Sequence, residues 1–299
     1  MRILVTGANG LLGQKLSQLL DQDPDIDLIA TSRGPSRVAL TRGVYVTLDV
    51  TDASAISQVL TTHRPDAVIH TAAMTQVDQC ETEREACWLQ NVTAVEYLCN
   101  ACQAMGVHLI HISTDFVFDG AHGPLDERAE PHPISHYGES KLAAEQLVQS
   151  LTTPWTIVRT VLVYGVTKDQ SRSNIVLWVK ASLEADKSIR VVDDQWRTPT
   201  LAEDLAEGCR RIAGKKATGI YHISGEEMMT PYTIALRTAD CFGLDKALIQ
   251  RTDSEEFKQP AKRPRKTGFI IDKAKRDLGY SPHSFQEGLE LVRKQLKGG

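Results

Sequence analysis

The sequence lacks any long hydrophobic run. Its apolar stretches are no longer than a β-strand, whereas a helix that crosses a bilayer needs about 20 consecutive apolar residues. The N-terminal MRILVTG runs directly into glycines and has neither the hydrophobic core nor the small-residue cleavage site of a signal peptide. We therefore expect a cytoplasmic protein with no membrane partner.

The sequence also lacks an excess of positive charge. Its 34 Lys and Arg residues are outnumbered by 38 Asp and Glu residues, which gives a formal net charge of -4 at pH 7. Because there is no broad basic field, we expect no nucleic-acid partner. The one basic stretch, PAKRPRK, is predicted to be a solvated loop.

The six cysteines form no metal-binding pattern. Only Cys99 and Cys102 have the C-x-x-C spacing, and they lie in a stretch expected to be helical, with no second ligand pair nearby. His108 and His111 are three residues apart on an expected strand, so they point to opposite faces and do not share a metal. We predict buried thiols and no metal site.

Short β-branched runs alternate with helical stretches over the first 165 residues. This alternation predicts βαβ units and an α/β fold, a doubly wound parallel sheet (Rossmann), for 1–165, with segments near 198–225 returning to it. Residues 166–299 are expected to form a smaller C-terminal region that binds substrate. The expected strands are 2–7, 26–32, 44–50, 66–72, 107–113 and 155–165, and the expected helices are 11–22, 53–63, 86–105, 136–151, 172–185 and 230–243.

A glycine-rich turn follows the first expected strand. In TGANGLLGQKL, Gly7, Gly10 and Gly13 have a G-x-x-G-x-x-G spacing. Glycine lets the backbone turn tightly, approach a pyrophosphate and pack closely on the next helix, whose N-terminus faces the anion. A glycine triplet alone is weak evidence, but this one ends a strand and opens a helix, so it predicts a dinucleotide site in 1–165.

The second expected strand ends in ATSR, which supplies hydrogen-bond donors and a cation but no carboxylate. A carboxylate here would bind a ribose 2′-hydroxyl, whereas an arginine accommodates a 2′-phosphate. Ser32 and Arg33 therefore favour NADPH, with NADH as the alternative cofactor. The alternative for Arg33 is an exposed loop residue with no ligand.

Further cofactor contacts are expected at the same turn and at later strand ends. Asp49 is expected to accept from the adenine amino group, and Val50 to pack on the ring. Small side chains after the fourth strand would let the backbone run close to the cofactor. The remaining cofactor-binding candidates are Asn9, Leu11, Leu12, Thr71, Ala72 and Ala73.

A hydroxyl, a phenol and an ammonium are expected to meet at one substrate carbonyl. Tyr137 and Lys141, in YGESK, lie four apart on an expected helix and so on one face, and Thr114 ends the fifth strand 23 residues before Tyr137. Reduction of a ketone needs a hydride from a nicotinamide and a proton from a nearby acid. We expect Lys141 and the nicotinamide charge to lower the pKa of Tyr137 towards neutrality.

The chain resembles the extended short-chain dehydrogenase/reductases, and within them most closely the dTDP-4-dehydrorhamnose reductase family. The motifs that carry the resemblance span nearly the whole chain in family order. STDFVFDG and DDQ-x-x-x-PT are the more specific ones. The complete set is TGANGLLG, LDVTD, HTAAMTQVDQCE, NVTAV, HISTDFVFDG, YGESKLAAE, RTVLVYG, DDQWRTPTLAEDLA and RPRKTGFIID.

The resemblance implies roles for single residues. Tyr137 would be the general acid, Lys141 would bind the nicotinamide ribose, Thr114 would orient the carbonyl, and Asn91 would support the lysine. The tyrosine of the second Tyr-Lys pentapeptide, YGVTK at 164–168, follows a strand at a glycine turn, so it is expected to line the sugar pocket or to pack at the strand end. The substrate-binding residues implied are Thr75, Val77, Asp78, Asp115, Phe116, Gln195, Arg197 and Thr200.

The chain departs from the family at two positions. Leu162 stands where a tryptophan commonly packs on the sugar, and Gln79 stands where a lysine is common. Arg263 or Arg265, in the basic stretch, is an alternative contact for the substrate diphosphate. These departures bear on the sugar that is bound and not on the redox chemistry.

The function implied is NADPH-dependent reduction of the 4-keto group of a nucleoside-diphosphate deoxysugar, with dTDP-4-dehydrorhamnose to dTDP-rhamnose as the first choice. Related dehydratases commonly have a glutamate where this chain has Phe116, which argues against dehydration. Two alternatives stay open: a nucleotide-sugar epimerase that retains NAD, and an NADP-binding regulatory subunit of the methionine adenosyltransferase type. The expected partner is a nucleotide sugar, and a homodimer is left open.

Overall fold

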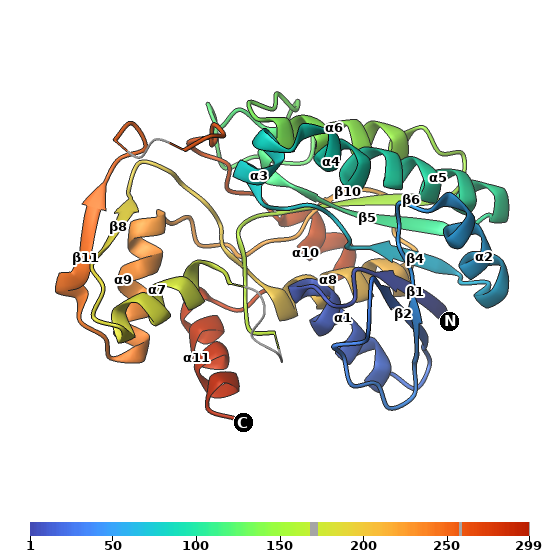
Figure 1. Cartoon of the computed structure of the whole chain (residues 1–299), viewed down its shortest axis with the longest axis horizontal. Helices are drawn as coiled ribbons and strands as arrows, with labels where there is room; N and C mark the ends of the chain where they lie inside the picture. The colour runs from blue at the N-terminus through green and yellow to red at the C-terminus, as the bar shows by residue number, and fades with distance from the viewer. Residues whose placement is uncertain (168–172, 257–258, 299) are drawn as a thin grey trace.

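The computed structural model describes residues 1–167, 173–256 and 259–298. Lys168 of the second pentapeptide and Arg172 at the start of an expected helix lie outside the described residues. Figure 1 shows a larger part, in which a sheet lies between two layers of helices, and a smaller part of strands and helices beside it.

The larger part contains a seven-stranded sheet in the order β10-β6-β5-β4-β1-β2-β3, in which every pairing is parallel. The expected doubly wound parallel sheet is therefore confirmed. The strands are β1 (Arg2–Thr6), β2 (Asp27–Ser32), β3 (Val44–Thr47), β4 (Ala67–His70), β5 (His108–Thr114), β6 (Trp155–Thr160) and β10 (Gly219–His222).

Alternate residues of the central strands feed two separate hydrophobic cores. Ile3 and Val5 pack with α1 (Leu11–Gln22), α8 (Ala202–Lys215) and α10 (Asp272–Leu278) on one face. Leu4 packs with α2 (Ala53–His63), α5 (Ala94–Met105) and α6 (His136–Gln149) on the other. Because both faces are covered, the strands are apolar almost throughout, as in other parallel sheets.

The chain returns to the first sheet after residue 200. β10 pairs with β6, with Gly219 opposite Thr156, and α8 packs against α1. The segment 264–270 also runs back beside the larger part, where the backbone N–H of Leu125 donates to the carbonyl of Gly268. The division of function at residue 165 stays a prediction.

The smaller part is built on the parallel pair β8 (Ile189–Val192) and β11 (Ile249–Thr252), with α7 (Ile175–Glu184), α9 (Pro231–Phe242) and α11 (Phe285–Leu296) around it. A shorter pair, β7 (Val163–Tyr164) and β9 (Thr200–Leu201), leads into it. Tyr164 is 1% exposed and its ring packs edge-on against Phe285. Of its two expected positions, Tyr164 takes the one at the strand end.

The helix expected over 86–105 is interrupted. It forms as α4 (Arg84–Trp88), a π-helical turn (Leu89–Thr93) and α5, preceded by α3 (Val77–Thr82). Single π turns within helices are frequent at functional sites. All six cysteines are free and buried, as expected. No helix within the described ranges is both long and apolar enough to cross a membrane, and the cytoplasmic location stays a prediction.

Candidate functional site

The glycine turn after β1 leaves space that only glycine can provide. Gly7 has φ +70°, and a Cβ on it would lie 2.7 Å from the backbone N of Ala72. A Cβ on Gly13 would lie 2.1 Å from the carbonyl oxygen of Gly7. No side chain caps the N-terminus of α1, so its first N–H groups, including those of Leu11 and Leu12, are available to an anion. The turn therefore fits the pyrophosphate of a dinucleotide.

Asn9 joins the glycine turn to the loop after β2. Its Nδ2 donates to the carbonyl of Pro35 at 3.0 Å and to the Tyr45 hydroxyl at 3.3 Å, and its Oδ1 accepts from the backbone N–H of Arg37 at 2.9 Å. Arg33 and Arg37 are both exposed in this loop. The sequence reasoning missed Arg37, although a second arginine four residues after the first was a signal for it.

The ends of the next two strands are fixed by local hydrogen bonds. Asp49 Oδ1 accepts from the backbone N–H and the hydroxyl of Thr51, at 2.9 and 2.8 Å. Thr71 Oγ1 donates to the carbonyl of Thr6 at 2.6 Å, which holds the end of β4, including the half-buried Ala72 and Ala73, beside the glycine turn. Val50 is 5% exposed.

Tyr137 and Lys141 lie one turn apart on α6, which Ser135 caps by accepting from the N–H of Gly138. A Cβ on Gly138 would lie 2.2 Å from the carbonyl oxygen of Phe116. The glycine of YGESK thus lets the start of α6 approach the turn that begins at Thr114. Thr114 Oγ1 accepts from the N–H of Phe116 at 3.2 Å. The structure brings the three predicted catalytic residues to one edge of the sheet.

The phenol of Tyr137 is buried and lies against the Phe116 ring, with the ring centroids 5.6 Å apart. Burial raises the pKa of Tyr137, and the nearby Thr114 hydroxyl opposes that rise. In the protein alone, burial therefore dominates the pKa of this phenol. The lowering expected from Lys141 together with the nicotinamide charge stays a prediction. A raised pKa keeps the phenol protonated, which is the form that donates a proton.

Lys141 is 2% exposed, and its Nζ donates to the carbonyl of Ile112 at 2.8 Å and lies 3.0 Å from Nε2 of His111. Burial lowers the pKa of Lys141 to about 8, and the negative charge of Glu145 opposes the fall. Asn91, in the π-helical turn, supports the lysine indirectly. Its side chain bonds both backbone groups of Met74 and donates to the Ser140 hydroxyl, next to Lys141.

Arg197 pairs with Asp115 and holds the backbone of the basic stretch close to it. Arg197 Nε lies 3.5 Å from Asp115 Oδ2, and its other nitrogens donate to the carbonyls of Trp196, Pro264 and Arg265 at 2.8, 2.6 and 3.2 Å. Burial raises the pKa of Asp115, which the Arg197 charge opposes. Arg197 therefore connects the DDQ-x-x-x-PT block to the basic stretch.

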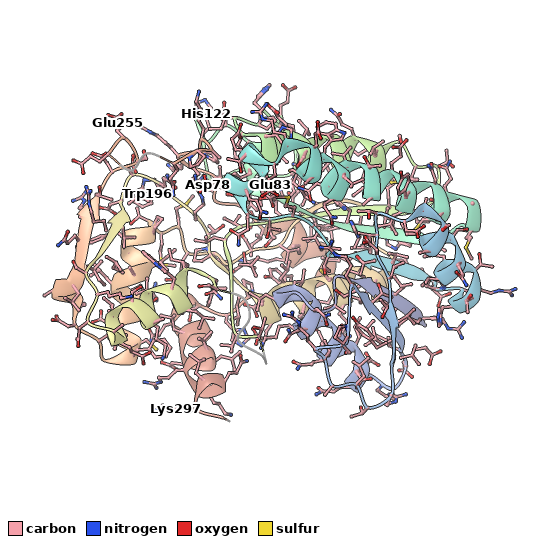
Figure 2. All side chains as sticks on the ribbon, in the orientation of Figure 1. Asp78, Glu83, His122, Trp196, Glu255 and Lys297 are labelled. Carbon is pink, nitrogen blue, oxygen red and sulfur yellow. The ribbon has the colours of Figure 1, made fainter. Side chains whose placement is uncertain are left out.

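The basic stretch is tied to α3 on the other side. Asp78 accepts two hydrogen bonds from Arg263, at 3.0 and 2.7 Å, and one from the N–H of Ala261. Arg265 pairs with Glu255 in solvent. Figure 2 shows Asp78 at the border between the two parts, with Glu255 on the side of the smaller part. The expected solvated loop is in fact anchored at one of its two central arginines.

The other implied substrate residues lie at different depths. Thr200 is fully buried and donates to the carbonyl of Val161, and Gln195 is 6% exposed beside Arg197. Val77 packs in the cluster around Tyr137, and Thr75 is exposed. Their contact with a sugar stays a prediction.

The two departures from the family pattern also differ in place. Gln79 donates to Glu83 on the surface of α3, away from the catalytic residues. Leu162 follows β6 with φ +39°, a conformation that a bulky side chain rarely adopts. Leu162 packs partly buried against the neighbouring hydrophobic clusters, and its contact with a sugar stays a prediction.

Comparison with known proteins gives the family. The family model described as RmlD substrate binding domain matches residues 1–297. The dTDP-4-dehydrorhamnose reductase of Streptomyces griseus is 36% identical over 272 residues, 88% of this chain and 84% of that protein. Methionine adenosyltransferase 2 subunit beta of Xenopus laevis is 32% identical over 259 residues, 85% of this chain and 76% of that protein.

Solved structures agree with the sequence relatives. A dTDP-4-dehydrorhamnose reductase from Clostridium acetobutylicum aligns with a TM-score of 0.88 and 29% identity, covering 99% of this chain and all of that chain. The dTDP-4-dehydrorhamnose reductase from Bacillus anthracis, solved in complex with NADP, aligns with a TM-score of 0.85 and 30% identity over 98% of this chain and 99% of that chain. The chain therefore belongs to the RmlD family, the dTDP-4-dehydrorhamnose reductase family of NAD(P)H-dependent reductases with an extended short-chain dehydrogenase/reductase fold.

Proposed function

We propose that this protein reduces the 4-keto group of a nucleoside-diphosphate deoxysugar with NADPH, and that its substrate is dTDP-4-dehydrorhamnose. The observation that carries the proposal is the meeting of Thr114, Tyr137 and Lys141 at the end of β5, on the same edge of the sheet as the glycine turn. Ligands of doubly wound sheets bind at this edge. The relatives named dTDP-4-dehydrorhamnose reductase support the choice of substrate.

Each catalytic residue has one task in this reaction. When bound, NADPH would supply the hydride for the new C–H bond at C4. The Thr114 hydroxyl orients the carbonyl, and Tyr137 gives its proton to the carbonyl oxygen, so that the product is an alcohol and the phenol becomes a phenolate. The Lys141 ammonium stabilises that negative charge, because opposite charges in a buried site interact strongly.

The cofactor preference follows from the loop after β2. Residues 33–37 carry two arginines and no carboxylate, and Asn9 fixes this loop to the glycine turn. A 2′-phosphate would meet cations there, and a ribose 2′-hydroxyl would find no carboxylate acceptor. NADPH is therefore the proposed cofactor, and NADH the weaker one.

Dehydration of the sugar would need a base that removes a ring proton, and this chain has Phe116 where that base is expected. Phe116 follows Asp115 and places its ring edge-on against Tyr137, at the position where related dehydratases commonly have a glutamate. This arrangement favours reduction over dehydration. An epimerase would use the same triad, but it would retain its nucleotide through purification.

The test uses the purified protein, NADPH and a panel of nucleotide ketosugars made in place by a dehydratase, with NADPH absorbance as the readout. We expect consumption of one NADPH for each dTDP-4-dehydrorhamnose, and its loss in Tyr137→Phe. An active epimerase would interconvert sugars without net consumption of NADPH, which would contradict the proposal.

A second candidate function rests on the relatives named methionine adenosyltransferase 2 subunit beta. In that role the protein would bind NADP and a methionine adenosyltransferase without turnover. Two outcomes together would favour this second function: no NADPH consumption with any ketosugar, and a stable complex with the methionine adenosyltransferase on size-exclusion chromatography. The cytoplasmic location expected from the sequence and a homodimer also stay proposals.

A further inference from the structure

Two histidines lie beneath the catalytic lysine. His70 on β4 and His111 on β5 are direct neighbours in the parallel pairing of these strands. Their rings stack with centroids 5.4 Å apart and planes 23° apart, and they are 1% and 0% exposed. The buried pair therefore lies stacked directly beneath Lys141 of α6.

The hydrogen bonds define the state of His111. Its Nε2 lies 3.0 Å from Lys141 Nζ, and an ammonium can only donate, so Nε2 accepts and the proton is on Nδ1. Burial lowers the pKa of His70 to about 3 and that of His111 well below its usual value. Both rings are neutral, so they do not repel the lysine.

Histidine is a costly choice at these positions. Nδ1 of His111 and Nε2 of His70 have no hydrogen-bond partner within the described part of the chain, and a buried polar atom without a partner destabilises the fold. Nδ1 of His70 lies 2.7 Å from the Thr6 hydroxyl. An apolar side chain at position 111 would avoid the orphaned nitrogen but would leave Lys141 without this acceptor.

We propose that His111, braced by His70, is a positioning residue of the reductase, whose neutral ring accepts a hydrogen bond from Lys141 and holds the ammonium at the end of β5. The inference rests on the proposed function. Together with the Ile112 carbonyl at 2.8 Å, His111 occupies two of the three ammonium N–H groups. These two hydrogen bonds fix the direction of the third N–H group, which is then available to donate to a nicotinamide ribose.

The other charged and titratable groups around Lys141 act on it through space. Glu145 lies one turn further along α6, and Cys80 and Cys87 face it from α3 and α4. The Glu145 charge favours the ammonium form, as would a thiolate at Cys87, and His111 favours it through a direct hydrogen bond. Loss of that acceptor should lower the pKa of Lys141, since a hydrogen bond to the charged form stabilises it.

Two substitutions, His111→Gln and His111→Asn, distinguish loss of the hydrogen bond to Lys141 from the general effect of replacing the histidine. His111→Gln can place its amide oxygen near the position of Nε2, whereas His111→Asn is one carbon shorter and leaves Lys141 without an acceptor. In reduction assays, activity should decline at high pH as Lys141 loses its proton. We expect this decline to move to lower pH by about one unit in His111→Asn and to stay near the wild-type position in His111→Gln.

A second readout does not depend on turnover. The fraction of Lys141 that reacts with a trace amine-acylating reagent, measured by mass spectrometry across pH, reports the pKa of its side chain. His108→Asn is the matched control, because His108 is also buried on β5 but pairs with Thr156. We expect the labelling curve to shift in His111→Asn only.

The outcomes distinguish this inference from the proposed function. A shifted labelling curve in a protein that reduces no ketosugar would support the lysine–histidine contact and contradict the reductase. Labelling and pH profiles that are equal in His111→Asn, His111→Gln and the His108→Asn control would overturn the inference, whatever the activity. NADP affinity and Tm of each variant show whether it is folded.

Discussion

The buried ion pair between Arg159 and Glu145 offers the strongest test of the packing behind the site. Glu145 accepts from Arg159 Nε at 3.0 Å and Nη2 at 2.6 Å, and from the Ser113 hydroxyl at 2.5 Å. The side chain of Glu145 is 0% exposed and that of Arg159 is 2% exposed. Arg159 also lies over the Phe118 ring, 5.1 Å from its centroid. The pair joins β5, β6 and α6 directly behind Lys141.

Arg159→Met removes the charge and keeps an unbranched stem on Phe118. Glu145 would then be a buried carboxylate with only Ser113 as a donor. Breaking one partner of such a pair costs about 3–5 kcal/mol. The unfolding entropy near Tm is about 2.1 cal/mol/K per residue, which for 299 residues is about 0.6 kcal/mol/K, so Tm should fall by about 5–8 °C.

The matched control is the double variant Arg159→Met with Glu145→Gln. It removes the charge of both partners, and its amide can still accept from Ser113, so we expect it to recover at least about half of the lost stability. Thermal unfolding followed by circular dichroism measures both. If the single variant is no less stable than the double one, an unpaired charge is not the reason for the loss, and the reasoning is refuted.

Three further predictions follow from single contacts. Arg33→Ala should weaken NADPH binding by about 10- to 100-fold, because a hydrogen bond to a charged group contributes about 1.5–3 kcal/mol. It should barely change NADH binding. An equal loss of affinity for both cofactors in fluorescence titrations would contradict the 2′-phosphate assignment. Gly138→Ala should lower Tm and kcat together, because the new Cβ would lie 2.2 Å from the carbonyl oxygen of Phe116. Relief of such a clash costs about 1–3 kcal/mol. A fully active variant with unchanged Tm would exclude the close approach. His283 pairs with Asp204 at 2.6 Å, and this hydrogen bond raises the pKa of His283. The stabilisation from the pair is therefore complete below the unfolded pKa of about 6.5 and is lost as the pH rises through the folded pKa. Tm should decline less steeply over that pH range in His283→Gln than in the wild type, and parallel curves would count against the pair.

The sequence was sufficient for features that depend on local pattern. The glycine turn follows from three glycines at a strand end, since only glycine tolerates φ +70° at Gly7 and the contact of Gly13 with the Gly7 carbonyl. The position of YGESK at the start of a helix followed from its helical spacing, whereas its catalytic role stays a prediction. The parallel sheet followed from apolar strands that alternate with amphipathic helices.

Contacts set by tertiary packing could not be predicted in this way. The pKa of Tyr137 depends on how deeply the phenol is buried, which spacing does not state. Arg197 turns inward to three backbone carbonyls, although an arginine in a polar block gives no sign of its direction. His70 and His111 lie 41 residues apart, and their stacking depends on the register of β4 against β5.

Residues 264–280 have a consequence for synthesis on the ribosome. Phe269, Ile271, Leu278 and Tyr280 belong to the same buried cluster as Ile3 and Val5 of the first strand. A nascent chain that ends before residue 264 already contains every strand of the large sheet but lacks part of the core on one of its faces. Such a chain would expose apolar surface and stay open to proteolysis, so the dinucleotide site should form late, after the C-terminal segment has left the exit tunnel.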